Sequence, residues 1–123
     1  MLNGSCLCGA CTFAVTGPVR SASVCHCTMC RKMTGHTWAS AQAPETAVAI
    51  SGPVAWFEAS PKARRGFCPR CGSTLFWQGT GETAMSFSLG CIDGPTGIRL
   101  EKHIFTADKG DYYDIQDDLP RHP

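Results

Sequence analysis

Charged residues are scarce in this sequence of 123 residues, and neither sign of charge predominates. Lysine, arginine, aspartate and glutamate make up 17%, against about a quarter in an average soluble domain, and the formal net charge is +1. A surface that binds nucleic acid or an anionic membrane needs an excess of positive charge, so we expect neither partner. No uninterrupted apolar run approaches the roughly 18 residues of a membrane-spanning helix, so we expect no transmembrane segment.

The sequence also lacks a secretory signal, because neither a basic stretch nor an apolar stretch follows Met1. We therefore predict a cytoplasmic protein, and disulfides rarely persist in the cytoplasm. This prediction decides how the nine cysteines are interpreted. Pairs at C-x-C and C-x2-C spacing in a reduced chain indicate metal ligands rather than disulfides. An iron–sulfur cluster stays open as an alternative, although no fourth cysteine joins the central group at a familiar spacing.

Seven of the cysteines fall into three close groups, which divide naturally into a set of four and a set of three. Thiolate sulfur suits zinc, and structural zinc takes four ligands in a tetrahedron. The two outer groups together predict a structural zinc site of Cys6, Cys8, Cys68 and Cys71. The central group leaves one coordination position open, as catalytic zinc does, and predicts a reactive zinc held by Cys25, Cys27 and Cys30. We therefore expect two zinc ions per chain.

Thirteen glycines and eight prolines favour many turns, and hence a mainly β fold rather than a helix bundle. Short runs of alternating polarity predict strands, which we expect to pair antiparallel within a single zinc-stabilised domain spanning residues 1–123. One short helix is expected directly after the triple cysteine. Thr28 is the predicted N-cap and Gly35 the predicted end of this helix.

A basic segment precedes and enters the second cysteine knuckle. It contains Lys62, Arg64, Arg65 and Arg70. Arginine binds carboxylates through paired hydrogen bonds, so Arg64, Arg65 and Arg70 are candidates for a rim that holds an acidic substrate. The alternative interpretation is a solvated loop.

Four further residues have thiol or imidazole side chains, but their roles are not clear from the sequence. Cys11 shares a strand face with apolar residues, which indicates a small buried side chain. Cys91 has no partner at knuckle spacing. His26 lies between two predicted ligands with its ring on the opposite face, so it either supports the metal site from behind or is a half-exposed polar residue. His36 receives no role.

Three stretches carry a family resemblance: GSCLCGA at 4–10, CHCTMCRKMTG at 25–35 and RGFCPRCGS at 65–73. With the closing segment 103–120, they resemble the glutathione-dependent formaldehyde-activating enzyme family, which shares its domain with centromere protein V. The resemblance implies a β-tent fold, two zinc sites and carbon–sulfur lyase activity. Residue by residue, it matches Cys6, Cys8, Cys68 and Cys71 to the structural zinc, and Cys25, Cys27 and Cys30 to the catalytic zinc.

The function expected from these residues is a zinc-dependent enzyme that forms or cleaves an adduct between a thiol and a small aldehyde. The resemblance implies glutathione as the type of thiol and formaldehyde as the type of aldehyde. Glutathione carries two carboxylates, which would give the basic rim a role. The alternative is a non-catalytic module with two zinc ions that binds a protein partner. The sequence also leaves a homo-oligomer open.

Overall fold

Two β-sheets and one short helix make up the fold, which confirms the predicted mainly β class. The computed structural model describes residues 1–123. The smaller sheet is antiparallel and has the order β1-β2-β5, formed by β1 (Leu2–Ser5), β2 (Thr12–Val15) and β5 (Val48–Ser51). Short 3-10 turns follow β4, β9 and β10, namely η1 (Glu45–Ala47), η2 (Leu89–Cys91) and η3 (Thr106–Asp108).

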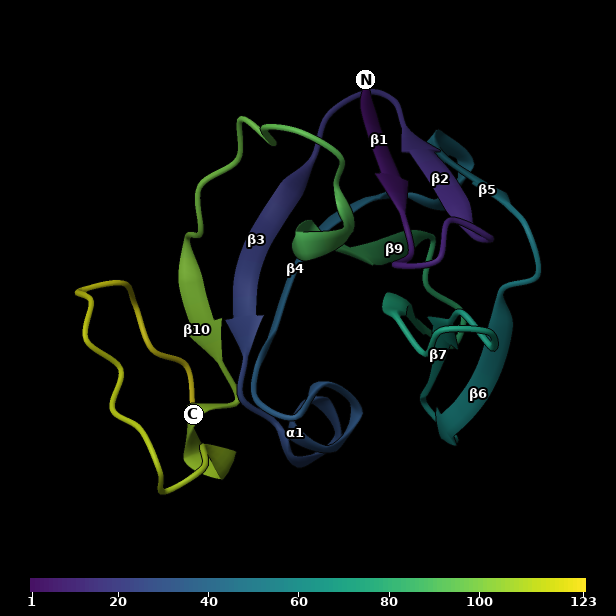
Figure 1. Cartoon of the computed structure of the whole chain (residues 1–123). Helices are drawn as coiled ribbons and strands as arrows, with labels where there is room; N and C mark the ends of the chain where they lie inside the picture. The colour runs from purple at the N-terminus through teal and green to yellow at the C-terminus, as the bar shows by residue number, and fades with distance from the viewer.

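The larger sheet has seven strands and is strongly curled (Figure 1). Its order is β10 (Lys102–Ile104), β3 (Arg20–Cys25), β4 (Trp38–Pro44), β9 (Ala84–Ser88), β8 (Thr74–Gly79), β7 (Ala63–Phe67) and β6 (Ala55–Ser60). Neighbouring strands are antiparallel, with one exception that the sequence patterns did not indicate: β10 pairs with β3 in parallel. A parallel neighbour needs a crossover, which residues 92–101 provide.

The main core lies between the two sheets. Phe13 of β2 meets Phe76 of β8 edge to face, with ring centroids 5.0 Å apart, and Phe87 of β9 lies 6.0 Å from Phe13. Gly4 of β1 packs directly over the Phe13 ring, since a Cβ there would come within 2.2 Å of it. The strand can therefore cross the ring only because residue 4 has no side chain.

Helix α1 (Thr28–Thr34) closes one end of the large sheet, below β3 and β4 in Figure 1. The predicted N-cap was wrong by one residue: Cys27 caps the helix, and its Sγ accepts a hydrogen bond from the Cys30 backbone N–H at 3.2 Å. Gly35 ends the helix as predicted, in the left-handed conformation with φ 83°. No helix in the structure has the length and apolarity to cross a bilayer.

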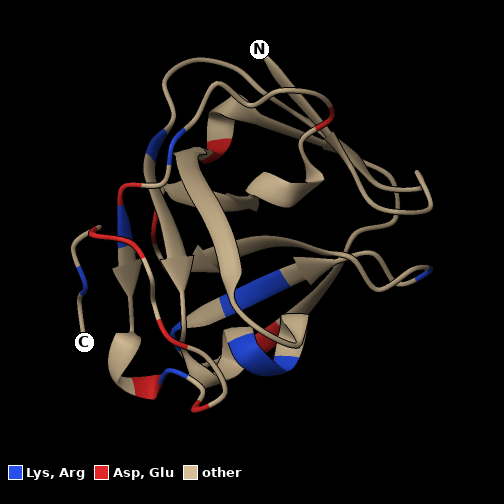
Figure 2. Ribbon diagram, turned by 60° about the vertical axis from the view of Figure 1, so that its left-hand side comes forward, with Lys and Arg blue, Asp and Glu red and all other residues tan.

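The C-terminal arm, defined here as residues 109–123, runs along the outside of β10 (Figure 1). The backbones of His103 and His122 are hydrogen bonded at 2.9 Å, and His103 forms a parallel bridge with Arg121. Acidic positions recur along this arm, whereas α1 beside it carries basic positions (Figure 2). Arg31 of α1 donates to the Asp108 carbonyl at 3.0 Å, so the chain entering the arm is tied to the helix.

Candidate metal centres

Four sulfur atoms converge where two tight turns face each other. The turn after β1 supplies Cys6 and Cys8, and the turn between β7 and β8 supplies Cys68 and Cys71. All four lie within 4.8 Å of one another, with 3.6 Å from Cys6 Sγ to Cys8 Sγ and 3.8 Å from Cys8 Sγ to Cys68 Sγ. The sequence prediction grouped the same four residues.

Backbone hydrogen bonds hold these two turns in shape. Gly72 N–H donates to the Cys68 carbonyl at 2.8 Å, and Cys11 N–H donates to Cys6 Sγ at 3.3 Å. A bond of 3.0 Å from Leu7 N–H to Ser73 Oγ joins one turn to the other. Donation to sulfur favours the thiolate form, which is the form that binds a metal.

The donor set and its spacing fit zinc. Zinc–sulfur bonds of about 2.3 Å in a tetrahedron place the sulfur atoms about 3.8 Å apart, and the two sulfur–sulfur distances of 3.6 and 3.8 Å agree. Four cysteines complete the tetrahedron, so this cluster has the composition of a closed structural site.

The second cluster contains three sulfur atoms, from Cys25, Cys27 and Cys30, also within 4.8 Å of one another. Cys25 ends β3, Cys27 caps α1, and Cys30 lies in the first turn of the helix. Cys25 and Cys30 are buried, and Cys27 is half-buried. The set lacks a fourth cysteine, so its residues fit a metal that keeps one position free.

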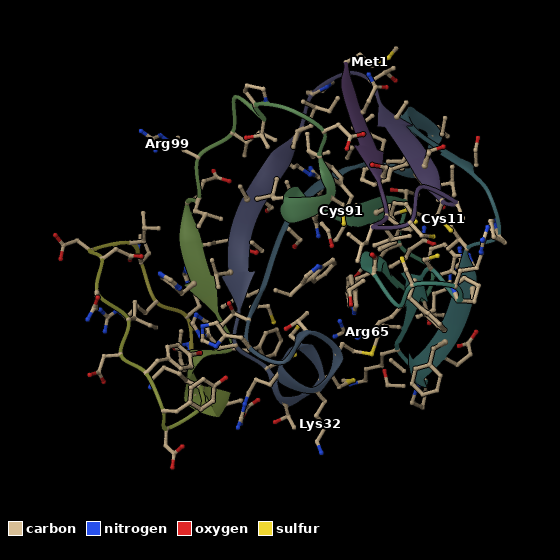
Figure 3. The ribbon with its side chains drawn as sticks, in the orientation of Figure 1. Met1, Cys11, Lys32, Arg65, Cys91 and Arg99 are labelled. Carbon is tan, nitrogen blue, oxygen red and sulfur yellow. The ribbon has the colours of Figure 1, made fainter.

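Arg65 of β7 reaches across the curled sheet to this second cluster. Both of its terminal nitrogens lie 3.6 Å from Cys30 Sγ, and Nη2 lies 4.0 Å from Cys27 Sγ. The residue is 3% exposed, and its Nε has no hydrogen-bond partner. The pKa of Cys30 is lowered to about 6, first by a hydrogen bond from Cys25 and then by the charge of Arg65. Figure 3 shows the Arg65 side chain turned inward, whereas Lys32 and Arg99 point away from the molecule.

The three arginines predicted as one rim do not come together, which corrects that expectation. Successive residues of a strand face opposite sides, so Arg64 points away from the Arg65 face. Its guanidinium lies 4.0 Å above the Trp56 ring and donates to Gln78 Oε1 at 2.8 Å. Arg70 is exposed on the knuckle turn. Only Arg65 of the three lines the cavity described next.

The three-cysteine cluster opens onto a cavity of about 500 Å³ on the concave face of the large sheet. Trp38 and Trp77 line it beside the cysteines. Strands β3, β4 and β9 add a polar wall that sequence reasoning missed, formed by Ser21, Ser23, Ser40, Gln42 and Ser86. A signal for part of this wall was present, because Ser23 and Cys25 are two residues apart in a strand and therefore share one face.

His26, which lies between two of the three cysteines, takes part in a chain of hydrogen bonds. Its Nδ1 contacts the Tyr113 hydroxyl, and its Nε2 lies 2.9 Å from His103 Nδ1. His103 Nε2 lies 2.9 Å from the Asp117 carboxylate, which accepts only. With both imidazole rings neutral, the Tyr113 hydroxyl therefore donates to His26, His26 donates to His103, and His103 donates to the Asp117 carboxylate. Burial lowers the pKa of His26, which favours its neutral form.

These hydrogen bonds hold the His26 ring in the interior. The residue is 1% exposed, so it is not the half-exposed polar residue of the second interpretation. Its partners in the C-terminal arm were not found from sequence, since they lie more than 80 residues away in the chain. His36 also meets the arm, with Nδ1 3.0 Å from the Tyr112 hydroxyl. The arm thus contacts one residue that lies between two of the cysteines and one residue that follows the helix.

The two unassigned cysteines lie near the four-cysteine cluster. Cys11 is fully buried in the main core, as predicted for a small apolar side chain. Cys91 is half-buried in η2, and its Sγ lies 3.6 Å from the Thr74 carbonyl. Neither belongs to the groups of sulfur atoms that could hold a metal. None of the nine cysteines forms a disulfide.

A mainly β fold with two clusters of cysteines that could each hold a metal ion defines a cysteine-rich β protein. A profile of the glutathione-dependent formaldehyde-activating enzyme family matches residues 1–108, and the chain belongs to this family. The fold is similar to the crystal structure of a Rhodobacter sphaeroides protein, with a TM-score of 0.61 and 20% sequence identity. That alignment covers 77% of this chain and 91% of the other. No curated protein sequence matches the chain.

Proposed function

We propose that this protein is a zinc-dependent enzyme of the carbon–sulfur lyase type, which forms or cleaves an adduct between a glutathione-like thiol and a small aldehyde such as formaldehyde. The observation that carries the proposal is the opening of the three-cysteine cluster onto the cavity of about 500 Å³, with Arg65 buried beside the sulfur atoms. The family name points to the same pair of substrates. Cys6, Cys8, Cys68 and Cys71 would hold a structural zinc, and Cys25, Cys27 and Cys30 a catalytic one.

The reaction needs a thiolate and a site for the oxygen of the aldehyde. The thiol sulfur attacks the carbonyl carbon, a carbon–sulfur bond forms, and the carbon–oxygen π bond breaks. The oxygen then takes up the proton that the thiol gave up, so the product is a hydroxymethyl thioether when the aldehyde is formaldehyde. A zinc ion at the three cysteines would supply an open coordination position and lower the pKa of the substrate thiol.

The residues of the chain set the electrostatics of this step. Three thiolates and a divalent ion carry a net charge of −1, which the Arg65 guanidinium offsets from 3.6 Å. The Arg65 side chain makes no hydrogen bond other than its contacts to sulfur, so it keeps N–H groups that can donate to the oxygen as negative charge develops there. Trp38 and Trp77 limit the access of water at the same end of the cavity.

The direct test measures zinc content and turnover together. We expect two zinc ions per chain by elemental analysis, one of which changes its chelator sensitivity when glutathione is added. Exchange spectroscopy with ¹³C-formaldehyde should show faster interconversion of free aldehyde and glutathione adduct than in buffer alone. The spontaneous reaction provides the baseline. A chain with both zinc ions and no acceleration for any thiol and aldehyde pair would refute the proposal.

The alternative, a non-catalytic module for a protein partner, predicts a different result. In that case the second cluster would ignore small thiols, and loss of its metal would change only partner binding. The cavity argues for the enzyme, since a protein-binding surface does not require a hollow beside the metal ligands.

A further inference from the structure

The two ends of the cavity differ in polarity. Beside the cysteines, apolar side chains line the cavity together with Arg65: Met29 directly precedes Cys30, and Ile104 is paired in register with Cys25. Two residues farther along β3, or about 7 Å, Ser23 faces Ser40 of β4. The hydroxyls of Ser21, Ser23 and Ser40 have no partner within the protein, and so are free to bind a ligand.

The backbone is strained at both ends of this cavity. Ser21 and Phe105 are the two residues other than glycine with positive φ, at 56° and 54°, and both line the cavity. For a bulky side chain such as Phe105 this conformation is rare and unfavourable. Such strain concentrates where a side chain is held for binding or catalysis. Here it presents a hydroxyl at one end and an aromatic ring at the other.

The apolar side chains at the cysteine end are also unusually exposed. Phe105 is 53% exposed and Met29 is 43% exposed, although both border a cavity in which they could be covered. Apolar surface of this kind gains free energy when an apolar group of a ligand packs against it. A hydrogen atom, which is all that formaldehyde carries on its carbonyl carbon, would leave it uncovered.

We propose that the apolar end formed by Met29, Ile104 and Phe105 receives an aliphatic or aromatic substituent of the carbonyl substrate, while the serine-lined end holds the polar body of the thiol. The preferred substrate is then the adduct of a hydrophilic thiol with an aldehyde larger than formaldehyde. The reacting carbon lies between the two ends, because it is bonded to the sulfur that meets the cysteine cluster. This inference rests on the proposed function, whose chemistry it leaves unchanged.

Binding of unreactive thioethers tests this assignment separately from turnover. The probes are S-methyl-, S-butyl- and S-hexylglutathione, titrated into the zinc-loaded protein by calorimetry. We expect the dissociation constant to fall about fourfold for each methylene added, as burial of apolar surface predicts. Phe105→Asn removes the ring and suits the left-handed backbone, so it should fold and bind all three probes with similar affinity. Phe57→Asn is the matched control, because Phe57 is 56% exposed but lies outside the cavity.

The possible failures are distinguishable. Equal affinity for the three probes, or no binding of any, in a protein that accelerates the formaldehyde adduct would overturn the substrate assignment and leave the proposed function standing. The same holds if Phe57→Asn and Phe105→Asn flatten the series equally. Absence of both thioether binding and acceleration with every aldehyde would overturn the two proposals together.

Discussion

The two cysteine clusters use the same ligand atoms but have opposite surroundings. The four-cysteine cluster is bounded by two turns whose backbone N–H groups point at sulfur or tie one turn to the other. The three-cysteine cluster lies at the end of a cavity, and its charged neighbour is the buried side chain of Arg65. The sulfur atoms of the first cluster meet a backbone N–H group and the Ser73 hydroxyl, both uncharged, whereas the second cluster adds a cation and open space.

Because of this difference, we expect the four-cysteine cluster to stabilise the fold and the three-cysteine cluster to serve the reaction. The first cluster joins segments 60 residues apart in sequence, from the turn after β1 to the turn between β7 and β8, so it crosslinks the two sheets. The second cluster gathers three residues within six positions of the chain, which adds little constraint on the overall fold. Substitutions in the first cluster should therefore unfold the protein, whereas substitutions in the second should abolish activity and leave the fold intact.

The largest effect should come from Cys68→Ser. Cys68 is fully buried at the junction of the sheets, and its loss leaves three ligands and a buried hydroxyl. Structural zinc in small domains contributes on the order of 10 kcal/mol, comparable to the whole stability of a domain of this size. We expect circular dichroism to show an unfolded or aggregated chain. A soluble, cooperatively folding variant would contradict the structural role.

Cys30→Ser should have the next largest effect, on activity rather than on the fold. We expect the variant to keep its circular dichroism spectrum and one zinc ion, and to lose all acceleration of adduct formation over buffer. The fold should survive because α1 contributes a small part of the packing and the main core excludes this cluster. Cys91→Ser is the matched control, since it replaces another cysteine outside both clusters and should retain two zinc ions. Full activity in Cys30→Ser would remove the second cluster from the mechanism.

Cysteine spacing predicted the grouping of the seven ligand residues, because short C-x-C and C-x2-C segments constrain where their sulfur atoms can go. The mainly β fold followed from turn residues and short alternating runs. The parallel pairing of β10 with β3 could not be predicted, since no local pattern encodes which strand a distant segment meets. The same limit explains why the contact between His26 and Tyr113 of the arm could not be predicted. The inward direction of Arg65 required the register of β7, which composition does not contain.

Arg65 is the charged neighbour that distinguishes the three-cysteine cluster from the four-cysteine cluster, and its substitution tests the role of that charge. Arg65→Gln should lower kcat/KM by about 10²-fold, the usual cost of removing one donor to a developing oxyanion. Arg65→Lys keeps the charge but loses the planar arrangement of donors, so it should recover part of this loss. Arg64→Gln is the matched control, because Arg64 lies on the opposite face over Trp56. An equal loss in Arg64→Gln and Arg65→Gln would show that the effect comes from stability.

The smallest expected effect tests whether the arm supports the second cluster. Tyr113→Phe removes the hydroxyl that donates to His26, and should speed loss of one zinc ion to a chelator about tenfold, the low end of the range for a residue that supports metal ligands without binding the metal. The other zinc ion should be released at the wild-type rate, since the four-cysteine cluster does not touch the arm. Tyr112→Phe, which removes the contact to His36, serves as a control for general loosening of the arm.

Asp117→Asn should act in the same direction as Tyr113→Phe, with a defined pH dependence. A hydrogen bond from His103 holds the pKa of Asp117 below its usual value, so the contribution of the carboxylate is present above about pH 4 and is lost as pH falls through the lowered pKa. The effect of Asp117→Asn on zinc release should therefore be present at neutral pH and shrink as the pH falls toward about 4. Equal acceleration of release from both clusters would mean that the arm stabilises the whole fold rather than the cluster that faces the cavity.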